Sequence, residues 1–337
     1  VPLSIMDLPN PGNSPVKWIK VLLVGAKQII FDKDFPELLV LEVGAGAPND
    51  IKKIAKWLRP DISVFTKLAK TPVHIEFFES TEQLYNEKKS LALHTKKEGL
   101  VLFNGDDQIL SDLLSDITIR KNTFTIDGNI SFSKEGTTMN GKETITLPGV
   151  LGHQMMYPVA ALVEIYKELG VDTKEGLKSL TSNHSPTPGR ARIVRGFDDM
   201  LLIDDAYNAS PVAVQAALEV LDKFKTGGRK LFVFGDMMEL GDYAKEAHID
   251  VALQSTFINQ LVTIGELSQD THVKAVQLGI PAIHFDTSAE AGEWLIENHE
   301  QGDTILFKAS RHAIKMEQAI VQLALPEEHP KLVQEYL

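Results

Sequence analysis

The sequence predicts an α/β protein with two sheet-containing domains. Short apolar runs of strand length alternate with amphipathic segments of helix length, as in parallel strands joined by helical crossovers. The 337 residues are enough for about two domains. A polar, proline-bearing break at residues 183–189 separates two such runs. We therefore expect one domain at residues 1–184 and a second at residues 185–337.

The first domain is predicted to combine a parallel sheet with a small antiparallel insertion. Its expected strands are residues 38–42, 63–66 and 100–104, and its expected helices are residues 50–58, 82–94, 162–169 and 174–180. Between residues 117 and 147 polar and apolar residues alternate, with turn pairs at Asp127-Gly128 and Asn140-Gly141. Such pairs favour tight hairpin turns, so we expect antiparallel hairpins there.

The second domain is predicted to be another layered α/β structure. Its expected strands are residues 200–204, 230–234, 260–264 and 304–307. Ser210-Pro211 begins a helix, because serine caps a helix start and proline suits the first helical position. The apolar face of this helix is expected at Val214, Ala217, Leu218 and Leu221.

Composition excludes several functions. The net charge of −12 and the lack of a long basic stripe disfavour nucleic acid as a partner. The absence of cysteine removes disulfides and thiolate chemistry and suits the cytoplasm. The apolar runs are too short for membrane insertion. The opening VPLSI, without methionine, is typical of mid-domain sequence, so we expect a fragment.

The most pointed motif is the predicted strand that ends in Asp204 and Asp205, followed by Tyr207 and Asn208 before a helix start. Parallel α/β sheets bind ligands at the carboxyl ends of their strands, so this segment is a candidate site. The structural alternative is that an aspartate caps the loop and Tyr207 packs.

Glu42, His74 and Lys88 form a second candidate. Carboxylate and imidazole suit a divalent cation, and a buried lysine that captures carbon dioxide becomes a carbamate with oxygen ligands. The alternative for these residues is a structural histidine and a solvated Lys88-Lys89 pair on a helix surface.

Gly136–Lys142 imitates a phosphate-binding loop, but Glu143 stands where serine or threonine should ligate magnesium. An Asn-Gly turn and alternating threonines surround it, so we predict a hairpin.

Cationic residues follow a predicted strand and the predicted domain junction. Lys308, with Ser310 and Arg311, comes after a strand, and Arg190 follows Pro188-Gly189 at the domain junction. These cations suit an anionic substrate or nucleotide; the alternative for each is an ordinary salt bridge.

Taken together, the segments resemble the MurF branch of the Mur ligases. The resemblance runs from Val1 to about Leu323 and rests on LEVGAG (41–46), RPDISVFT (59–66), VHIEFFES (73–80), LFNGDD (102–107), TPGRARIV (187–194), LLIDDAYNASPVAVQAALEVL (201–221), FGDMMELGDYAKEAH (234–248) and ILFKASR (305–311). It implies that residues 1–184 are the central ATP-binding domain without its phosphate loop, and that residues 185–337 are the Rossmann-like C-terminal domain. An N-terminal domain is expected to be missing.

The resemblance also implies an activity. It is the ATP-dependent addition of D-Ala-D-Ala to UDP-N-acetylmuramoyl-tripeptide through an acyl phosphate, with Mg²⁺, in peptidoglycan precursor synthesis by a cytoplasmic monomer. The fragment alone is expected to be inactive. A related ligase of the cyanophycin or folylpolyglutamate type and a non-catalytic Mur-like scaffold remain alternatives.

Residue roles follow from the same resemblance. Glu42, His74 and Lys88 match metal-site positions, with Lys88 the lysine that is carbamylated and His74, Lys88 and Arg190 catalytic. Arg190, Asp205, His153 and Gln154 match nucleotide-binding positions, although the family has asparagine where Gln154 stands. The substrate side of the cleft is matched by Tyr207, Asn208, Lys308, Ser310 and Arg311.

Overall fold

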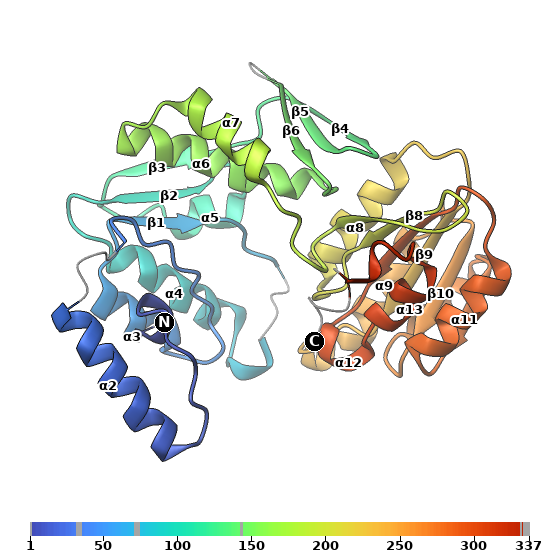
Figure 1. Ribbon diagram of the computed structural model, residues 1–337, viewed down its shortest axis with the longest axis horizontal. Helices are drawn as coiled ribbons and strands as arrows, with labels where there is room; N and C mark the ends of the chain where they lie inside the picture. Colours follow the sequence, from blue (N-terminus) through green and yellow to red (C-terminus); the bar gives the residue numbers. More distant parts are fainter. Residues whose placement is uncertain (1, 32–35, 71–74, 142–143, 331, 333–337) are drawn as a thin grey trace.

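The computed structural model describes the whole chain except residues 1, 32–35, 71–74, 142–143, 331 and 333–337. Figure 1 shows two sheet-containing units side by side, joined through the middle of the chain. The elements before residue 184 are α1 (Pro2–Ile5), α2 (Pro15–Phe31), α3 (Asp50–Leu58), β1 (Ile62–Phe65), η1 (Ile75–Phe77), α4 (Thr81–Leu93), β2 (Leu100–Asn104), α5 (Gln108–Leu113), β3 (Lys121–Phe124), β4 (Asn129–Ser133), β5 (Gly136–Asn140), β6 (Thr144–Pro148), η2 (His153–Met155), α6 (Met156–Leu169) and α7 (Thr173–Asn183).

The elements after residue 184 are β7 (Arg192–Arg195), β8 (Leu201–Asp204), α8 (Pro211–Lys223), β9 (Lys230–Gly235), η3 (Gly241–Tyr243), α9 (Ala244–Gln254), β10 (Gln260–Ile264), α10 (Gln269–Gln277), β11 (Ala282–Phe285), α11 (Ser288–Asn298), β12 (Thr304–Lys308), α12 (Arg311–Ile314) and α13 (Glu317–Leu323). Segments 184–191 and 205–210 are irregular and lie against each other, as the hydrogen bond from Tyr207 N to Gly189 O shows.

The first unit is built on a parallel sheet of order β1-β2-β3. Every residue of β2 is buried, because helices cover both faces of this central strand. On one face Val101 and Phe103 pack against α4 and α5, and on the other Leu100 and Leu102 pack against α6. The sequence therefore predicted the parallel class of this sheet correctly.

The predicted β insertion is an antiparallel meander of β4, β5 and β6. The imitation of a phosphate loop beginning at Gly136 falls on β5, which confirms the hairpin prediction. Asn140 ends β5 at the turn into β6, as expected. The hairpin at Asp127-Gly128 was wrong, because that pair lies between β3, which pairs in parallel with β2, and β4.

The second unit contains a six-stranded sheet of order β11-β10-β9-β12-β8-β7, parallel except for β7. Helices α8, α9 and α10 contribute to the core on one face, and α11 and α13 to the core on the other. The Ser210 hydroxyl accepts the Ala213 N–H, and Pro211 is the first residue of α8, as predicted. The expected apolar residues Val214, Ala217, Leu218 and Leu221 are all buried.

The predicted strand at residues 38–42 is wrong. This segment is irregular, and the Leu38, Leu39 and Val40 side chains are exposed. A strand needs a neighbour for its backbone hydrogen bonds, and among the described residues none pairs with β1 on its free side. Sequence analysis also missed β7, β11 and α2. No helix among the described residues has the length and apolarity needed to cross a bilayer.

A segment before the predicted domain boundary packs with both units. Segment 149–152 precedes it in sequence but pairs with the second unit's sheet, with Leu151 N donating to Ala191 O and Ile193 N donating to Gly149 O. Val150 packs in the core around β6 and α6, whereas Leu151 packs in the core of the second sheet. The boundary between residues 184 and 185 stays a prediction, since the two units share this segment.

The core of the second unit generates a stability prediction. Phe232 lies fully buried on the central strand β9, so Phe232→Ala should lower the free energy of unfolding by about 3–5 kcal/mol. Urea denaturation monitored by circular dichroism measures this loss of unfolding free energy. The control Leu253→Ala removes a half-exposed side chain and should change stability by about 0.5 kcal/mol or less. Similar losses in both variants would contradict the assigned core.

Candidate functional site

The carboxyl edge of the second sheet brings most of the predicted site residues together. In the strand order, β12 lies between β8 and β9. The connections that leave β8 and β9 cover one face of the sheet through α8 and α9, whereas the chain that leaves β12 covers the other face through α13. Open α/β sheets form ligand-binding crevices at such a switch point. The loop after β8, the loop after β12 and the linker before β7 all meet here, and they carry Arg190, Asp205, Tyr207, Asn208, Lys308, Ser310 and Arg311.

Two adjacent buried carboxylates hold the linker to this edge. Asp204 Oδ2 accepts hydrogen bonds from Gly189 N and from the Arg192 guanidinium, each at 3.0 Å. Asp205 Oδ1 accepts one from Ala191 N, also at 3.0 Å. Since buried carboxylates are costly without such donors, the strand end and the linker stabilise each other.

Lys308 anchors the loop from the other side. Its ammonium lies 2.7 Å from Asp205 Oδ2 and donates to the carbonyls of Asp205 (3.2 Å) and Asn208 (2.8 Å). An ammonium group has three donors, and these contacts use them all. The Ser310 hydroxyl adds a bond to Asn208 Oδ1 and accepts one from Met238 N. In this geometry Lys308 and Ser310 position the loop rather than extend toward a substrate.

The ion pair between Lys308 and Asp205 has opposing electrostatic effects. Burial raises the pKa of the Asp205 carboxyl above its usual range, and the positive charge of Lys308 partly offsets that rise. Only 3% of the Lys308 side chain and 11% of the Asp205 side chain are exposed. The pair is therefore a structural ion pair in a medium where losing one partner is costly.

Tyr207 presents the exposed part of the site. The guanidinium of Arg190 lies 4.2 Å from the centre of its ring, and that of Arg311 lies 5.9 Å from the same centre. The aromatic face stabilises cations, and two positive groups converge on one half-exposed ring. Gly189 permits this approach, because it has φ +68° and a Cβ there would lie 2.7 Å from Tyr207 N. The arrangement suits an anion such as a phosphate or carboxylate.

A second polar cluster lies where β2 ends and α6 begins. Burial and the negative charge of Asp106 raise the pKa of Tyr157. The His153 ring packs edge-on against Tyr157, at 6.4 Å between centroids. His153 Nδ1 also lies 3.5 Å from a carboxylate oxygen of Glu219 on α8, so this cluster reaches the second unit. Asp106 was missed as a site residue, although LFNGDD placed it after a strand.

Gln154 lies inward at the junction of the two units. It lines, with Asp205 and Ala191, a gap too small for a water molecule. Its Oε1 is buried without a hydrogen-bond partner among the described residues. The amide would have to turn outward to contact a nucleotide base.

Of the predicted metal ligands, only Glu42 and Lys88 lie among the described residues. His74 lies outside the described residues, and Glu42 is exposed on an irregular segment. Within the described part of the chain, no three histidine or acidic side chains form a metal-binding group. The two lysines of α4 nevertheless differ: Lys89 pairs with Asp116 at 2.7 Å, whereas Lys88 has no hydrogen bond or ion pair with a described residue. Burial lowers the pKa of Lys88.

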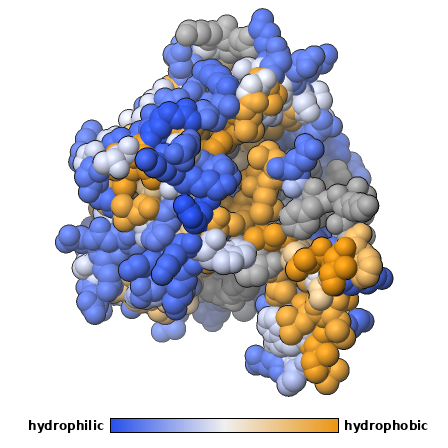
Figure 2. Space-filling view, turned by 90° about the vertical axis from the view of Figure 1, so that its left-hand side faces the viewer, coloured by the Kyte–Doolittle hydropathy of each residue, from blue (hydrophilic) through white to orange (hydrophobic). Residues whose placement is uncertain are grey.

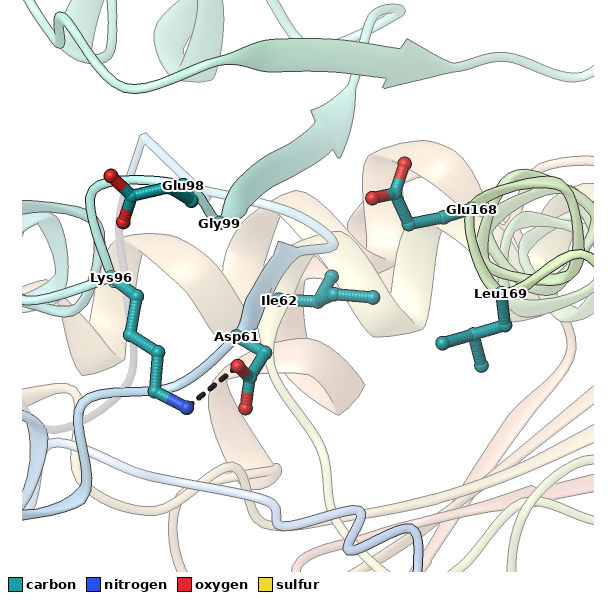
Figure 3. A pocket seen from close by; sticks show the side chains of 7 residues that line it. All are labelled: Asp61, Ile62, Lys96, Glu98, Gly99, Glu168 and Leu169. Atoms are coloured by element: carbon teal, nitrogen blue, oxygen red, sulfur yellow. Dashed lines mark hydrogen bonds and ion pairs between the residues drawn. The ribbon is translucent and has the colours of Figure 1, made fainter.

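A pocket of about 250 Å³ lies at the edge of the first sheet where strands β1 and β2 begin (Figure 3). Its lining residues Asp61, Ile62 and Gly99 come just before or at the start of β1 and β2, and Asp61 pairs with Lys96 at 2.6 Å. Parallel sheets present their ligand sites at the carboxyl ends of their strands, so we do not assign this pocket to the candidate site.

Family comparisons agree with the two-unit architecture. Residues 25–155 match the Mur ligase middle domain, and residues 189–311 match the Mur ligase glutamate ligase domain. The two matches together span about three quarters of the chain, and the chain belongs to the Mur ligase family.

Individual relatives point to one branch of this family. The chain is 28% identical over 297 residues to the UDP-N-acetylmuramoyl-tripeptide--D-alanyl-D-alanine ligase of Bacillus subtilis, covering 85% of this chain and 64% of that protein. The Escherichia coli ligase of the same name is 27% identical over 291 residues, covering 81% and 62%. The chain thus spans less than two thirds of these relatives. The Thermotoga maritima MurF ligase structure, solved with ADP, shares the fold, with a TM-score of 0.71 and 24% identity over 97% of this chain and 74% of that one.

The ion pair yields a pH-dependent prediction. Lys308→Met leaves the Asp205 carboxylate buried without its cation and should cost about 3 kcal/mol of unfolding free energy at pH 7. Because the folded-state pKa of Asp205 is raised, the folded protein retains this proton to higher pH than the unfolded chain. The penalty should therefore be smallest below the ordinary aspartate pKa of about 3.9 and grow as pH rises above it.

Urea denaturation at pH 4 and pH 7 measures this penalty. Lys167→Met is the matched control, since it removes an exposed pair with Glu164 and should cost about 0.5 kcal/mol or less. A Lys308→Met penalty that is equally small, or independent of pH, would contradict the assigned role.

Proposed function

We propose that the protein provides the central and C-terminal parts of an ATP-dependent ligase that joins D-Ala-D-Ala to UDP-N-acetylmuramoyl-tripeptide. The observation that carries this proposal is the paired guanidinium surface at Tyr207, in a chain of the Mur ligase family whose relatives named above have this activity in their names. We place the reaction in peptidoglycan precursor synthesis in the cytoplasm, and we expect a monomer.

The chemistry demands activation of a carboxylate. A carboxylate is a poor electrophile at neutral pH, so ATP transfers its terminal phosphoryl group to the tripeptide's carboxylate and ADP leaves. The amine of D-Ala-D-Ala attacks the resulting acyl phosphate, phosphate departs, and the amine gives up a proton as the amide forms. The protein's main task is to position these groups and stabilise their negative charge.

The second unit supplies a surface for the nucleotide. The planar guanidinium groups of Arg190 and Arg311 suit phosphate or carboxylate oxygens. Both groups lie against the ring of Tyr207, which keeps them close to each other. The Thermotoga maritima MurF ligase was solved in complex with ADP, which supports nucleotide binding by this protein. We propose that the Asp205 loop faces the ribose, that Lys308 and Ser310 fix the conformation of this loop, and that Tyr207 and Asn208 face the substrate.

Lys88 fits a metal-site role better than its neighbour Lys89. Burial lowers the pKa of Lys88, which favours the neutral amine that captures carbon dioxide. This amine makes no hydrogen bond or ion pair with a described residue. We propose that carbamylated Lys88, with Glu42 and His74, holds Mg²⁺. A bound magnesium ion would neutralise charge on the transferring phosphoryl group.

The activity test uses the full-length protein. With ATP, Mg²⁺, UDP-N-acetylmuramoyl-tripeptide and D-Ala-D-Ala, we expect it to release phosphate and form the amide. Lys88→Ala should lose activity on the order of 100-fold or more, and short-chain carboxylates should restore part of it. Lys89→Ala is the control, because this lysine already pairs with Asp116.

Each other outcome has a distinct meaning. Normal activity of Lys88→Ala would remove the carbamate. Turnover with a different amino acid or peptide in place of D-Ala-D-Ala would indicate a related ligase. Nucleotide binding without any turnover would support the non-catalytic scaffold.

Nucleotide affinity tests the arginine pair separately. Arg190→Gln should weaken ADP binding by about 10-fold to 100-fold, as expected for one lost charge-assisted hydrogen bond. Isothermal calorimetry measures it. The control Arg120→Gln changes an arginine paired with Glu168 at the far edge of the first sheet and should leave ADP affinity unchanged. Equal affinities in both variants would exclude Arg190 from the site.

A further inference from the structure

Helix α2 (Pro15–Phe31) exposes an unusual amount of apolar surface. It projects from the first unit on the side away from the second unit (Figure 1), and Figure 2 shows a mostly hydrophobic projection in that part of the molecule. Its exposed apolar side chains are Val16, Trp18, Ile19, Leu22, Leu23, Val24, Ile29, Ile30 and Phe31. A continuous exposed patch of this kind marks an interaction site.

The helix has two apolar faces, and only the narrower one is packed. Val21 and Gly25, four residues apart, are the buried positions. Gly25 lies against Leu8, since a Cβ there would be 3.3 Å from the Leu8 side chain. The Trp18 indole N–H donates to Gly12 O at 3.0 Å and ties the first turn to the preceding loop. The segment that precedes the helix thus covers it on one side.

The other apolar face forms a stripe along the outer side. At 100° per residue, Ile19, Leu22, Leu23 and Ile30 fall within about 100° of one another. These four side chains are 60–70% exposed. Leu23 and Ile30, seven residues apart, lie within about 20° of each other on this stripe.

The charges on α2 indicate which kind of surface it can bind. The helix carries Lys17, Lys20 and Lys27 and no acidic residue, in a chain whose net charge is −12. Lys20 and Lys27 lie along one border of the stripe, where their stems can cover apolar surface while their ammonium groups reach polar headgroups. A second copy packed on this face would bring lysines against lysines with no acid on either helix. An acidic surface with an apolar layer beneath it satisfies both features.

We propose that α2 lies in the headgroup region of an anionic lipid bilayer, with the stripe around Leu23 and Ile30 buried in the acyl boundary. The helix is about 25 Å long and has the lysines and the tryptophan typical of helices that lie parallel to a membrane surface. Like the other described helices, it is not long and apolar enough to cross the bilayer. This peripheral attachment goes beyond the proposed ligase activity and does not depend on it.

Vesicle binding by the full chain tests the proposal. We expect cosedimentation with vesicles of phosphatidylcholine and phosphatidylglycerol (3:1) at least 10-fold stronger than with phosphatidylcholine alone. Raising the salt to about 0.5 M should weaken binding, because screening reduces the lysine contribution. The double variant L23E/I30E should lose at least 10-fold in binding to the anionic vesicles, and K20Q/K27Q should lose the preference for phosphatidylglycerol.

The matched control is L253E/V276E, which places the same charges on half-exposed apolar positions of α9 and α10 in the second unit. It should bind vesicles like the unchanged protein, and circular dichroism should show all variants folded. Absence of vesicle binding, or equal binding by L23E/I30E, would overturn the proposal. So would a dimer in light scattering that dissociates in L23E/I30E while vesicles remain unbound, because a second copy would then cover the stripe.

Discussion

The pair of buried carboxylates at the end of β8 is the constraint on which the candidate site depends. Asp204 and Asp205 lie where water cannot solvate them, so the surrounding donors have to come from the protein. They come from the amides of Gly189 and Ala191, from Arg192 directly after them, and from Lys308 at the end of β12, so two distant segments of the chain supply them. Satisfying these charges therefore fixes the linker, the loop after β8 and the end of β12 in one arrangement. The exposed groups on Tyr207 and Arg190 follow from that geometry.

The first unit lacks a comparable constraint around its predicted metal ligands. Glu42 lies on a segment that makes no strand, and neighbouring Leu38 and Val40 remain exposed. These exposed neighbours do not pack around the Glu42 carboxylate and so do not fix its direction. Lys88 is different, because α4 packs against α3 and the sheet. The position of this lysine is determined by the fold, whereas the position of Glu42 is not.

The sequence predicted those parts in which local pattern and tertiary packing agree. Strands β2 and β10 and helix α3 have the expected bounds, because each combines a clear apolar pattern with two flanking breaks. The apolar run at residues 38–42 has the same pattern, yet pairing partners decide whether such a run becomes a strand. Convergence of Arg190, Tyr207 and Lys308 was expected only through a family resemblance. The inward role of Lys308 was not predicted, since its three contacts depend on the loop conformation.

The shared segment at the junction limits how the two units can move. A closure that brings Lys88 toward the Tyr207 surface has to rotate one unit against the other. Val150 and Leu151 are adjacent but packed in different cores, and two backbone hydrogen bonds tie segment 149–152 to β7 and its preceding residue. A rotation that kept those bonds would have to bend where the backbone permits it, at Gly149 and Gly152, which both have positive φ. A hinge in residues 184–188 alone is insufficient, because the chain crosses between the units at both places.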